Sequence, residues 1–277
     1  VFFVISGYLI GWIIMRDLEQ ERFSFLNFYA RRIRRIFPAL LVVLATALTI
    51  GWFALLPDEY KTLGKHVLGG AAFIDNFFLW QESGYFDISS KLKPLLHLWS
   101  LGIEEQFYII FPLILYLSYI KKINFYFIIL IFLILSFITN IYAYEISPTM
   151  DFYSPLTRFW ELVTGSLLAA CVRKRPAKRS YLLIDKHISK LLWRNSQKNN
   201  GRSLSLFLAI LGTTFFIISI TFARSTNPWP AWKAIFPVLG ASFFIAAGPI
   251  NAISKYILCN RISLFFGKIS YPLYLWH

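Results

Sequence analysis

The stretch that decides the fold of this chain is His97-Leu98-Trp99-Ser100-Leu101-Gly102-Ile103-Glu104-Glu105-Gln106-Phe107-Tyr108. It is followed by an apolar run, residues 109–120, in which only Tyr116, Ser118 and Tyr119 carry polar side-chain atoms. The run is typical of a membrane helix, and ionisable groups at the mouth of such a helix are costly to place. The stretch therefore predicts a transmembrane helix that begins with a polar site.

The composition places the chain among polytopic membrane proteins. Of its 277 residues, 57% are hydrophobic and only 15% are charged, whereas soluble domains are about half apolar and a quarter charged. The formal net charge is +14, but the basic residues cluster beside apolar segments, which indicates topology and not a nucleic-acid partner. Two distant cysteines, Cys171 and Cys259, support neither a disulfide framework nor a metal site, and no bound cofactor is expected.

We expect an all-α, polytopic transmembrane helical bundle with about eight spans, since about 20 apolar residues cross a bilayer. Residues 67–80 are apolar but short and contain Asp75 and Asn76, so a re-entrant segment is expected there. Both ends of the chain fall inside apolar segments, so we expect a membrane domain over 1–277 that is truncated at both ends. The expected spans are residues 1–15, 36–56, 97–119, 123–143, 154–172, 204–223, 232–251 and 261–277.

Basic residues predict the orientation of the spans. Segment 16–35 holds six arginines, and segment 173–202 holds ten Lys and Arg against one acid, Asp185. Short loops rich in Lys and Arg are cytoplasmic, so both segments are expected on that side. The two assignments agree only if 67–80 does not cross the bilayer fully.

The first candidate site lies on the helix expected from residue 97. His97, Glu104 and Tyr108 share one face, Ser100 lies beside it, and Glu105 points about a quarter-turn away. His97, Glu104 and Glu105 are the candidate catalytic residues, and Ser100 and Tyr108 are candidate substrate-binding residues. Two interpretations remain open: the polar wall of a substrate or acyl-donor tunnel, or a structural network in which a glutamate pairs with an arginine. Glu105 is the better candidate for the ion pair.

The second candidate site is the arginine block in Phe28-Tyr29-Ala30-Arg31-Arg32-Ile33-Arg34-Arg35-Ile36. Arginine binds phosphate through two parallel hydrogen bonds, so Arg31, Arg32 and Arg35 are candidates to bind an anionic ligand such as a nucleotide or coenzyme A. Basic residues also flank cytoplasmic helix ends routinely, and this interpretation stays open.

A third candidate pair is Arg158 and Glu161, three residues apart on one helix face. The two side chains could neutralise each other as a buried structural pair. Alternatively, Arg158 pairs with Glu104 or Glu105 of the first candidate site. On that interpretation Arg158 and Glu161 are candidate substrate-binding residues.

Taken together and in order, the blocks of this chain resemble the acyltransferase type-3 family of integral membrane O-acyltransferases. The resemblance covers essentially the whole chain. The matching blocks are Val1–Ile10, Phe28–Leu40, Tyr85–Asp87, Lys93–Tyr108, Thr157–Leu162 and Gly267–His277.

The resemblance implies transfer of an acyl group, commonly acetyl from acetyl-CoA, to a hydroxyl of a cell-envelope glycan such as lipopolysaccharide O-antigen, at the bacterial inner membrane. It implies that Arg32 and Arg35, with Arg31 adjacent, serve the acyl-CoA donor. It also places the general-base histidine upstream of Val1, so His97 is not assigned that role, and a C-terminal SGNH-type periplasmic domain often follows. The alternatives are a transporter or flippase of envelope precursors and a regulatory membrane subunit.

Overall fold

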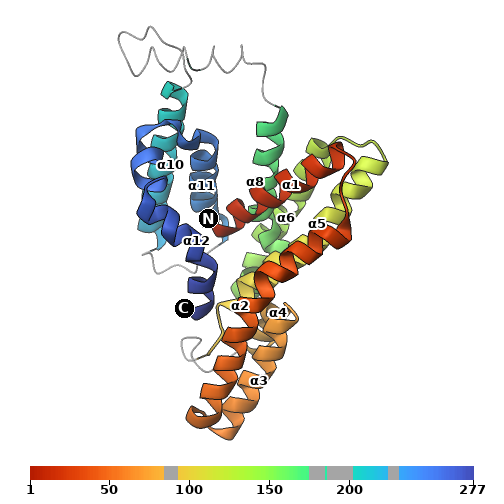
Figure 1. Cartoon of the computed structure of the whole chain (residues 1–277), viewed down its shortest axis with the longest axis vertical. Coiled ribbons are helices and arrows are strands. Elements are labelled where there is room, and N and C mark those ends of the chain that lie inside the picture. Colours follow the sequence, from red (N-terminus) through yellow and green to blue (C-terminus); the bar gives the residue numbers. More distant parts are fainter. Residues whose placement is uncertain (84–92, 175–184, 186–201, 224–230) are drawn as a thin grey trace. The chain divides into compact units, whose positions relative to one another are not determined.

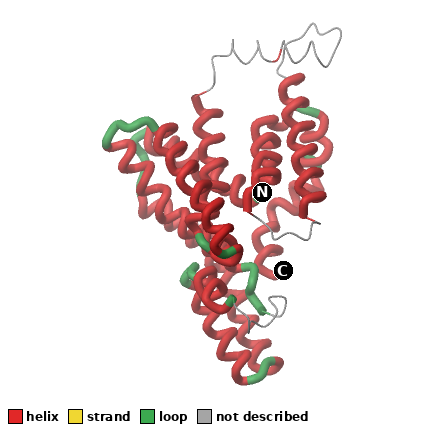
Figure 2. Tube along the Cα trace, turned by 180° about the vertical axis from the view of Figure 1, so that it is seen from behind, coloured by secondary structure: helices red, strands yellow, loops and turns green. Residues whose placement is uncertain are grey.

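The computed structural model describes residues 1–83, 93–174, 185, 202–223 and 231–277. Within these ranges all regular elements are helical, and Figure 2 shows helices and loops without a strand, so the predicted all-α class is confirmed. The basic segment 173–202 falls almost entirely outside the described residues, as does Tyr85–Asp87. The elements labelled in Figure 1 and their short companions are α1 (Phe2–Glu19), α2 (Phe25–Ala54), α3 (Pro57–Ala71), α4 (Asp75–Glu82), α5 (Leu98–Ile120), α6 (Phe125–Ile146), α7 (Pro148–Tyr153), α8 (Pro155–Lys174), α10 (Arg202–Ala223), η2 (Ala231–Ala234), α11 (Ile235–Ala247), η3 (Gly248–Ile250), the π-helix η4 (Ser254–Leu258) and α12 (Arg261–Trp276).

Local sequence signals set where α2 and α3 begin. Ser24 caps α2, and its hydroxyl accepts a hydrogen bond from the backbone N–H of Asn27 at 3.4 Å. Pro57 opens α3, where its missing N–H costs nothing, and the Glu59 carboxylate accepts from the backbone N–H of Leu56 at 3.0 Å. These contacts satisfy backbone groups that helix starts leave without partners.

Five helical segments within the described residues are long and apolar enough to cross a membrane, so the expected count of about eight spans is not confirmed. They are Phe25–Ala54, Leu98–Ile120, Phe125–Ile146, Arg202–Phe222 and Trp232–Ile250. Three expected spans are not among these five. The 18-residue α1 ends in charged residues, α8 carries charges at both ends, and α12 comprises Arg261–Trp276.

Residues 67–80 do not form one continuous span. Helix α3 ends at Ala71, the chain turns at residues 72–74 with Phe73 at φ 58°, and α4 begins at Asp75. Gln106 of α5 fixes this turn, because its side-chain amide donates to the Phe73 carbonyl at 2.7 Å and to Asn76 Oδ1 at 2.9 Å. The break agrees with the expectation that this segment does not cross the bilayer fully.

The described chain divides into two compact units. The α2–α5 unit comprises residues 14–123, 134–159 and 269–277. Within it α2 and α5 run antiparallel, since Tyr29 contacts the carbonyls of Tyr108 and Ile109 whereas Arg32, further along α2, contacts Glu105. Its aliphatic core consists of Leu40, Val43, Leu44, Leu63, Val67, Leu95, Leu98, Leu101 and Leu275.

The α10–α11 unit comprises residues 1–13, 124–133 and 160–268. The Phe216 ring of α10 stacks on Phe244 of α11 with centroids 5.6 Å apart. The first part of α1 packs closely on α8, because a Cβ added at Gly7 would overlap the Leu162 carbonyl and one at Gly165 would overlap the Val4 carbonyl. Glycine is required at both positions for this approach.

Candidate functional site

The centre of the α2–α5 unit is an ion pair between Arg32 of α2 and Glu105 of α5. The Arg32 Nη2 atom lies 3.2 Å from Glu105 Oε1, and the guanidinium carbon lies 3.5 Å from the centroid of the Tyr108 ring. The two charged side chains are only 17% and 12% exposed. The structure thus confirms that Glu105 forms an ion pair with a neighbouring helix, and its partner is Arg32 and not Arg158.

A small cavity of about 210 Å³ adjoins this pair, and we call it the Arg32 niche. The Nε–H of Arg32 is buried and has no hydrogen-bond partner among the described residues. Buried donors are nearly always satisfied, so this N–H marks Arg32 as an unusual residue beside the niche. The lining residues are Tyr29, Arg32, Ile33, Ile36, Phe37, Phe73, Glu105 and Ile109.

The other arginines of the block face outward. The Arg31 side chain is 61% exposed and lies 3.9 Å from Asp17 Oδ2, a surface pair that holds it only weakly. Arg34 and Arg35 are exposed as well. The block therefore presents one fixed, buried guanidinium and three at the surface within about one turn of α2.

The start of α5 contacts α12. The Ser100 and Tyr274 hydroxyls lie 2.9 Å apart, and the Tyr274 hydroxyl also donates to the His97 carbonyl. The His97 and Tyr274 rings meet edge to face with centroids 5.2 Å apart. His97 also lines a second cavity of about 880 Å³, which we call the upper cavity.

The remaining predicted residues do not converge on either cavity. Glu104 is buried, with 4% exposure, and lines neither the Arg32 niche nor the upper cavity. Arg158 donates to the Phe152 carbonyl at 3.3 Å, and its guanidinium lies over the Trp99 ring at 5.6 Å. Glu161, on α8, is buried and belongs to the α10–α11 unit. Their assignment as site residues stays a prediction.

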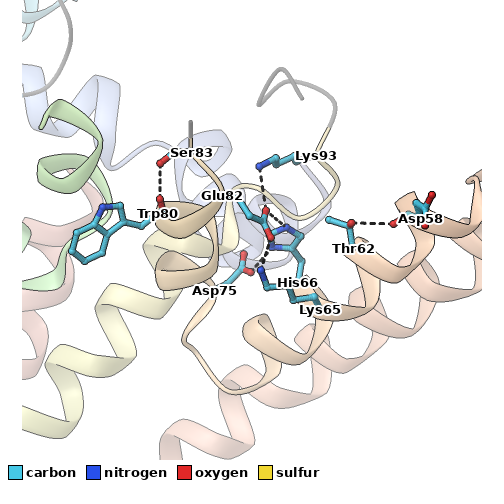
Figure 3. A network of polar contacts seen from close by, with 9 residues as sticks. All are labelled: Asp58, Thr62, Lys65, His66, Asp75, Trp80, Glu82, Ser83 and Lys93. Atoms are coloured by element: carbon cyan, nitrogen blue, oxygen red, sulfur yellow. Dashed lines mark hydrogen bonds and ion pairs between the residues drawn. The ribbon is translucent and has the colours of Figure 1, made fainter. Parts of the chain in front are cut away.

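A buried polar network joins α3, α4 and the segment before α5, as Figure 3 shows. The His66 ring lies between two carboxylates, with Nδ1 2.7 Å from Asp75 Oδ1 and Nε2 3.0 Å from Glu82 Oε2. Glu82 also binds the ammonium groups of Lys65 at 2.7 Å and Lys93 at 3.2 Å. We call these five residues the His66 network.

The network stabilises the charged forms of His66 and Glu82, whereas burial raises the pKa of Asp75. Burial acts most strongly on the pKa of His66 and lowers it, but the hydrogen bonds and charges of Asp75 and Glu82 together outweigh burial, so the pKa lies above its ordinary value. Burial likewise opposes ionisation of Glu82, but Lys65, His66 and Lys93 together hold the pKa of Glu82 below its ordinary value. Glu82 is therefore an anion that fixes Lys93.

Sequence reasoning missed this network and the role of Tyr274. A signal for the His66 network was present in the sequence, because Asp75 interrupts an apolar segment nine residues after His66. The pairing depends on the turn after Ala71, which returns α4 alongside α3. Tyr274 lies 174 residues from its partner Ser100, and no local spacing reports such a contact.

Comparison with known proteins shows which family and which relatives this chain is similar to. The acyltransferase domain family matches residues 1–277. An uncharacterised protein of Haemophilus influenzae is 37% identical over 82% of this chain and 87% of its own length. A Staphylococcus aureus (strain COL) protein provisionally named an O-acetyltransferase is 32% identical over 100% of this chain and 44% of its own length.

The O-acetyltransferase OatA of another Staphylococcus aureus strain is 28% identical, again over 100% of this chain and 44% of its own length. The chain thus spans less than half the length of these named relatives. None of the solved structures matches it significantly. The match over the whole sequence and the helical bundle with several possible membrane spans show that the chain belongs to the acyltransferase family, a family of enzymes that transfer acyl groups.

Proposed function

We propose that this protein is an O-acetyltransferase that moves an acetyl group from acetyl-CoA to a hydroxyl of a cell-envelope polysaccharide, such as lipopolysaccharide O-antigen, at the bacterial inner membrane. The names of the Staphylococcus aureus relatives support O-acetyl transfer. The donor and the acceptor class follow from the resemblance described above, and the Arg32 niche supplies the physical argument for the donor.

The observation that carries the proposal is the fixed guanidinium of Arg32. A guanidinium held by a carboxylate on one edge and a ring on its face has lost its rotamer freedom before a ligand arrives, which lowers the cost of binding. Its Nε–H is buried and unsatisfied by the described residues. Arg31 and Arg35, exposed on the same helix end, add positive charge for the phosphates of a coenzyme A donor.

The polar face of α5 connects the Arg32 niche with the upper cavity. It runs from His97 at the upper cavity, past buried Glu104, to Tyr108 under Arg32. Eleven residues separate its two ends, a rise of about 16 Å. Glu104 lies between them, closer to Tyr108, and we propose it as the carboxylate that shapes the path between donor and acceptor.

The test is acetyl-CoA binding to the full-length protein purified in detergent, measured by calorimetry. Loss of a charge-assisted hydrogen bond costs about 1.5–3 kcal/mol, so Arg32→Ala and Arg35→Ala should each weaken binding roughly ten- to a hundred-fold. Arg35 is exposed, so its removal leaves the fold intact. Lysine at either position should rescue only partly, because it lacks the planar fork.

Arg34→Ala is the matched control, because Arg34 is an exposed arginine of the same block that lies outside the proposed donor set. It should bind acetyl-CoA nearly as well as the unmodified protein. Unchanged donor affinity in both Arg32→Ala and Arg35→Ala would refute the assignment. An equal loss in all three variants would show a nonspecific basic surface in place of a site.

A further inference from the structure

The upper cavity lies at the other end of α2 from the Arg32 niche. The niche is lined by residues 29–37 of α2 and the upper cavity by residues 43–55. The middles of these two segments are about 16 residues apart, or about 24 Å along the helix. This distance approaches the ~30 Å thickness of a hydrocarbon core, so the two cavities lie towards opposite ends of one membrane-spanning helix.

The walls of the upper cavity are mostly apolar, with three basic residues, Lys93, His97 and His277. Val43, Ala47 and Ile50 of α2 line it together with Leu95 and Leu96. Lys93 and His97 belong to the segment that leads into α5, and His277 follows α12. An apolar cavity with a few convergent polar groups is the usual form of a ligand site, and about 880 Å³ lies within the ~300–1,000 Å³ that such sites occupy.

The surrounding structure holds Lys93 through Glu82, and Tyr274 contacts both the ring and the carbonyl of His97. Glu82 Oε2 lies 3.2 Å from the Lys93 ammonium, and the same oxygen lies 3.0 Å from Nε2 of His66, whose ring is anchored by Asp75 (Figure 3). The Nε2 atom of His97 is buried and has no hydrogen-bond partner among the described residues. The Glu82 carboxylate contacts two ammonium groups, those of Lys65 and Lys93, and cannot neutralise both, so an anion beside Lys93 is favoured.

We propose that the upper cavity binds a single-chain lipid phosphate, with the apolar chain along α2 and the phosphate at Lys93 and His97. Such a molecule combines the two chemistries that the cavity presents, and the cavity suits one chain and a small head group better than a two-chain phospholipid. His66 and Glu82 are then positioning residues that hold Lys93 at the wall. The inference rests on the proposed function only in naming this lipid as the carrier of the acceptor, and it concerns where the carrier is held, not where the acyl group is transferred.

The probe is radiolabelled dodecyl phosphate, bound at equilibrium to the full-length protein in nanodiscs of neutral phosphatidylcholine. Lys93→Gln should weaken binding about tenfold or more, because one charge-assisted hydrogen bond is lost. Lys61→Gln, at an exposed lysine of α3, is the matched control and should bind normally. Ala47→Phe fills the cavity and should abolish binding, whereas Val42→Phe, on the exposed face of α2, should not.

Three competitors identify the chemistry. Dodecanol should compete weakly because it lacks the anion, and inorganic phosphate should compete weakly because it lacks the chain. Phosphatidylglycerol that competes as well as dodecyl phosphate would overturn the single-chain assignment in favour of a membrane phospholipid site. Normal binding by both Lys93→Gln and Ala47→Phe would overturn the site itself.

His66→Gln separates positioning from folding. It should weaken dodecyl phosphate binding several-fold while acetyl-CoA binding at the Arg32 niche stays unchanged, and a parallel loss of both would indicate a merely structural role. The two proposals fail separately. If acetyl-CoA does not bind but the Lys93 result holds, the proposed function is wrong and the lipid site stands, and the reverse result removes only the lipid site.

Discussion

Replacing the Arg32–Glu105 pair tests whether the centre of the α2–α5 unit is an ion pair in a low-dielectric environment. Both side chains are less than one-fifth exposed. Removing one partner of such a pair leaves a buried charge without compensation and costs about 3–5 kcal/mol, whereas replacing both by apolar residues is often nearly neutral. We therefore expect Arg32→Leu and Glu105→Leu each to lower the free energy of unfolding by that amount, and the double variant to recover most of the loss.

Arg32→Leu should be the more costly single change. It also removes the guanidinium from the Tyr108 ring, a contact worth about 0.5–2 kcal/mol. The measurement is equilibrium unfolding of the purified protein in mixed micelles, with the four proteins compared as a double-mutant cycle.

The Asp17–Arg31 contact at 3.9 Å, in which only Arg31 is exposed, is the internal reference. Asp17 also binds Arg16 at 2.9 Å, so Arg31→Ala is the cleaner change, and it should alter stability by less than about 1 kcal/mol. Effects of the two leucine substitutions that add within about 0.5 kcal/mol would show that the side chains do not interact. That outcome would refute both the ion pair and the fixed guanidinium on which the donor site depends.

Glu104→Gln keeps the shape of a buried side chain and removes its charge, so it should leave membrane abundance normal and reduce acceptor acetylation at least tenfold; normal activity would exclude a role in the path between the cavities. Gly165→Leu should lower the apparent melting temperature and the yield, because its side chain would collide with the α1 backbone, and a stable variant would contradict the close packing of α1 on α8. His66→Gln should lose most stability relative to the unmodified protein at and below about pH 6.5, since a pKa raised on folding stabilises the protonated state and that gain fades as pH rises through the folded value; a stability difference that grows with pH would contradict this. In intact cells Ser180→Cys should resist a membrane-impermeant thiol reagent, because the basic segment is predicted to be cytoplasmic, and ready labelling from outside would reverse the orientation.

The sequence alone determined the class of the protein and the kind of chemistry at its centre. Long apolar runs with few charges predict membrane helices, because a helix satisfies all its backbone hydrogen bonds within one segment. Ordered motifs identified the family that the comparison confirms. Helical periodicity predicted that Glu105 points away from Glu104 and towards another helix, because side chains four apart share a face and adjacent ones do not. That reasoning needs only the geometry of one helix.

Partners and cavities were decided by tertiary structure. Periodicity showed that Glu105 faces a neighbour, but the antiparallel register of α2 on α5 selected Arg32 and not Arg158. The expected count of about eight spans stays unconfirmed, since five segments of the described chain are long and apolar enough to cross a membrane. The His66 network requires the turn after Ala71, and the Ser100–Tyr274 contact requires α12 to pack against the start of α5. Such contacts depend on how helices pack, and packing is set by the whole set of side chains and not by local spacing.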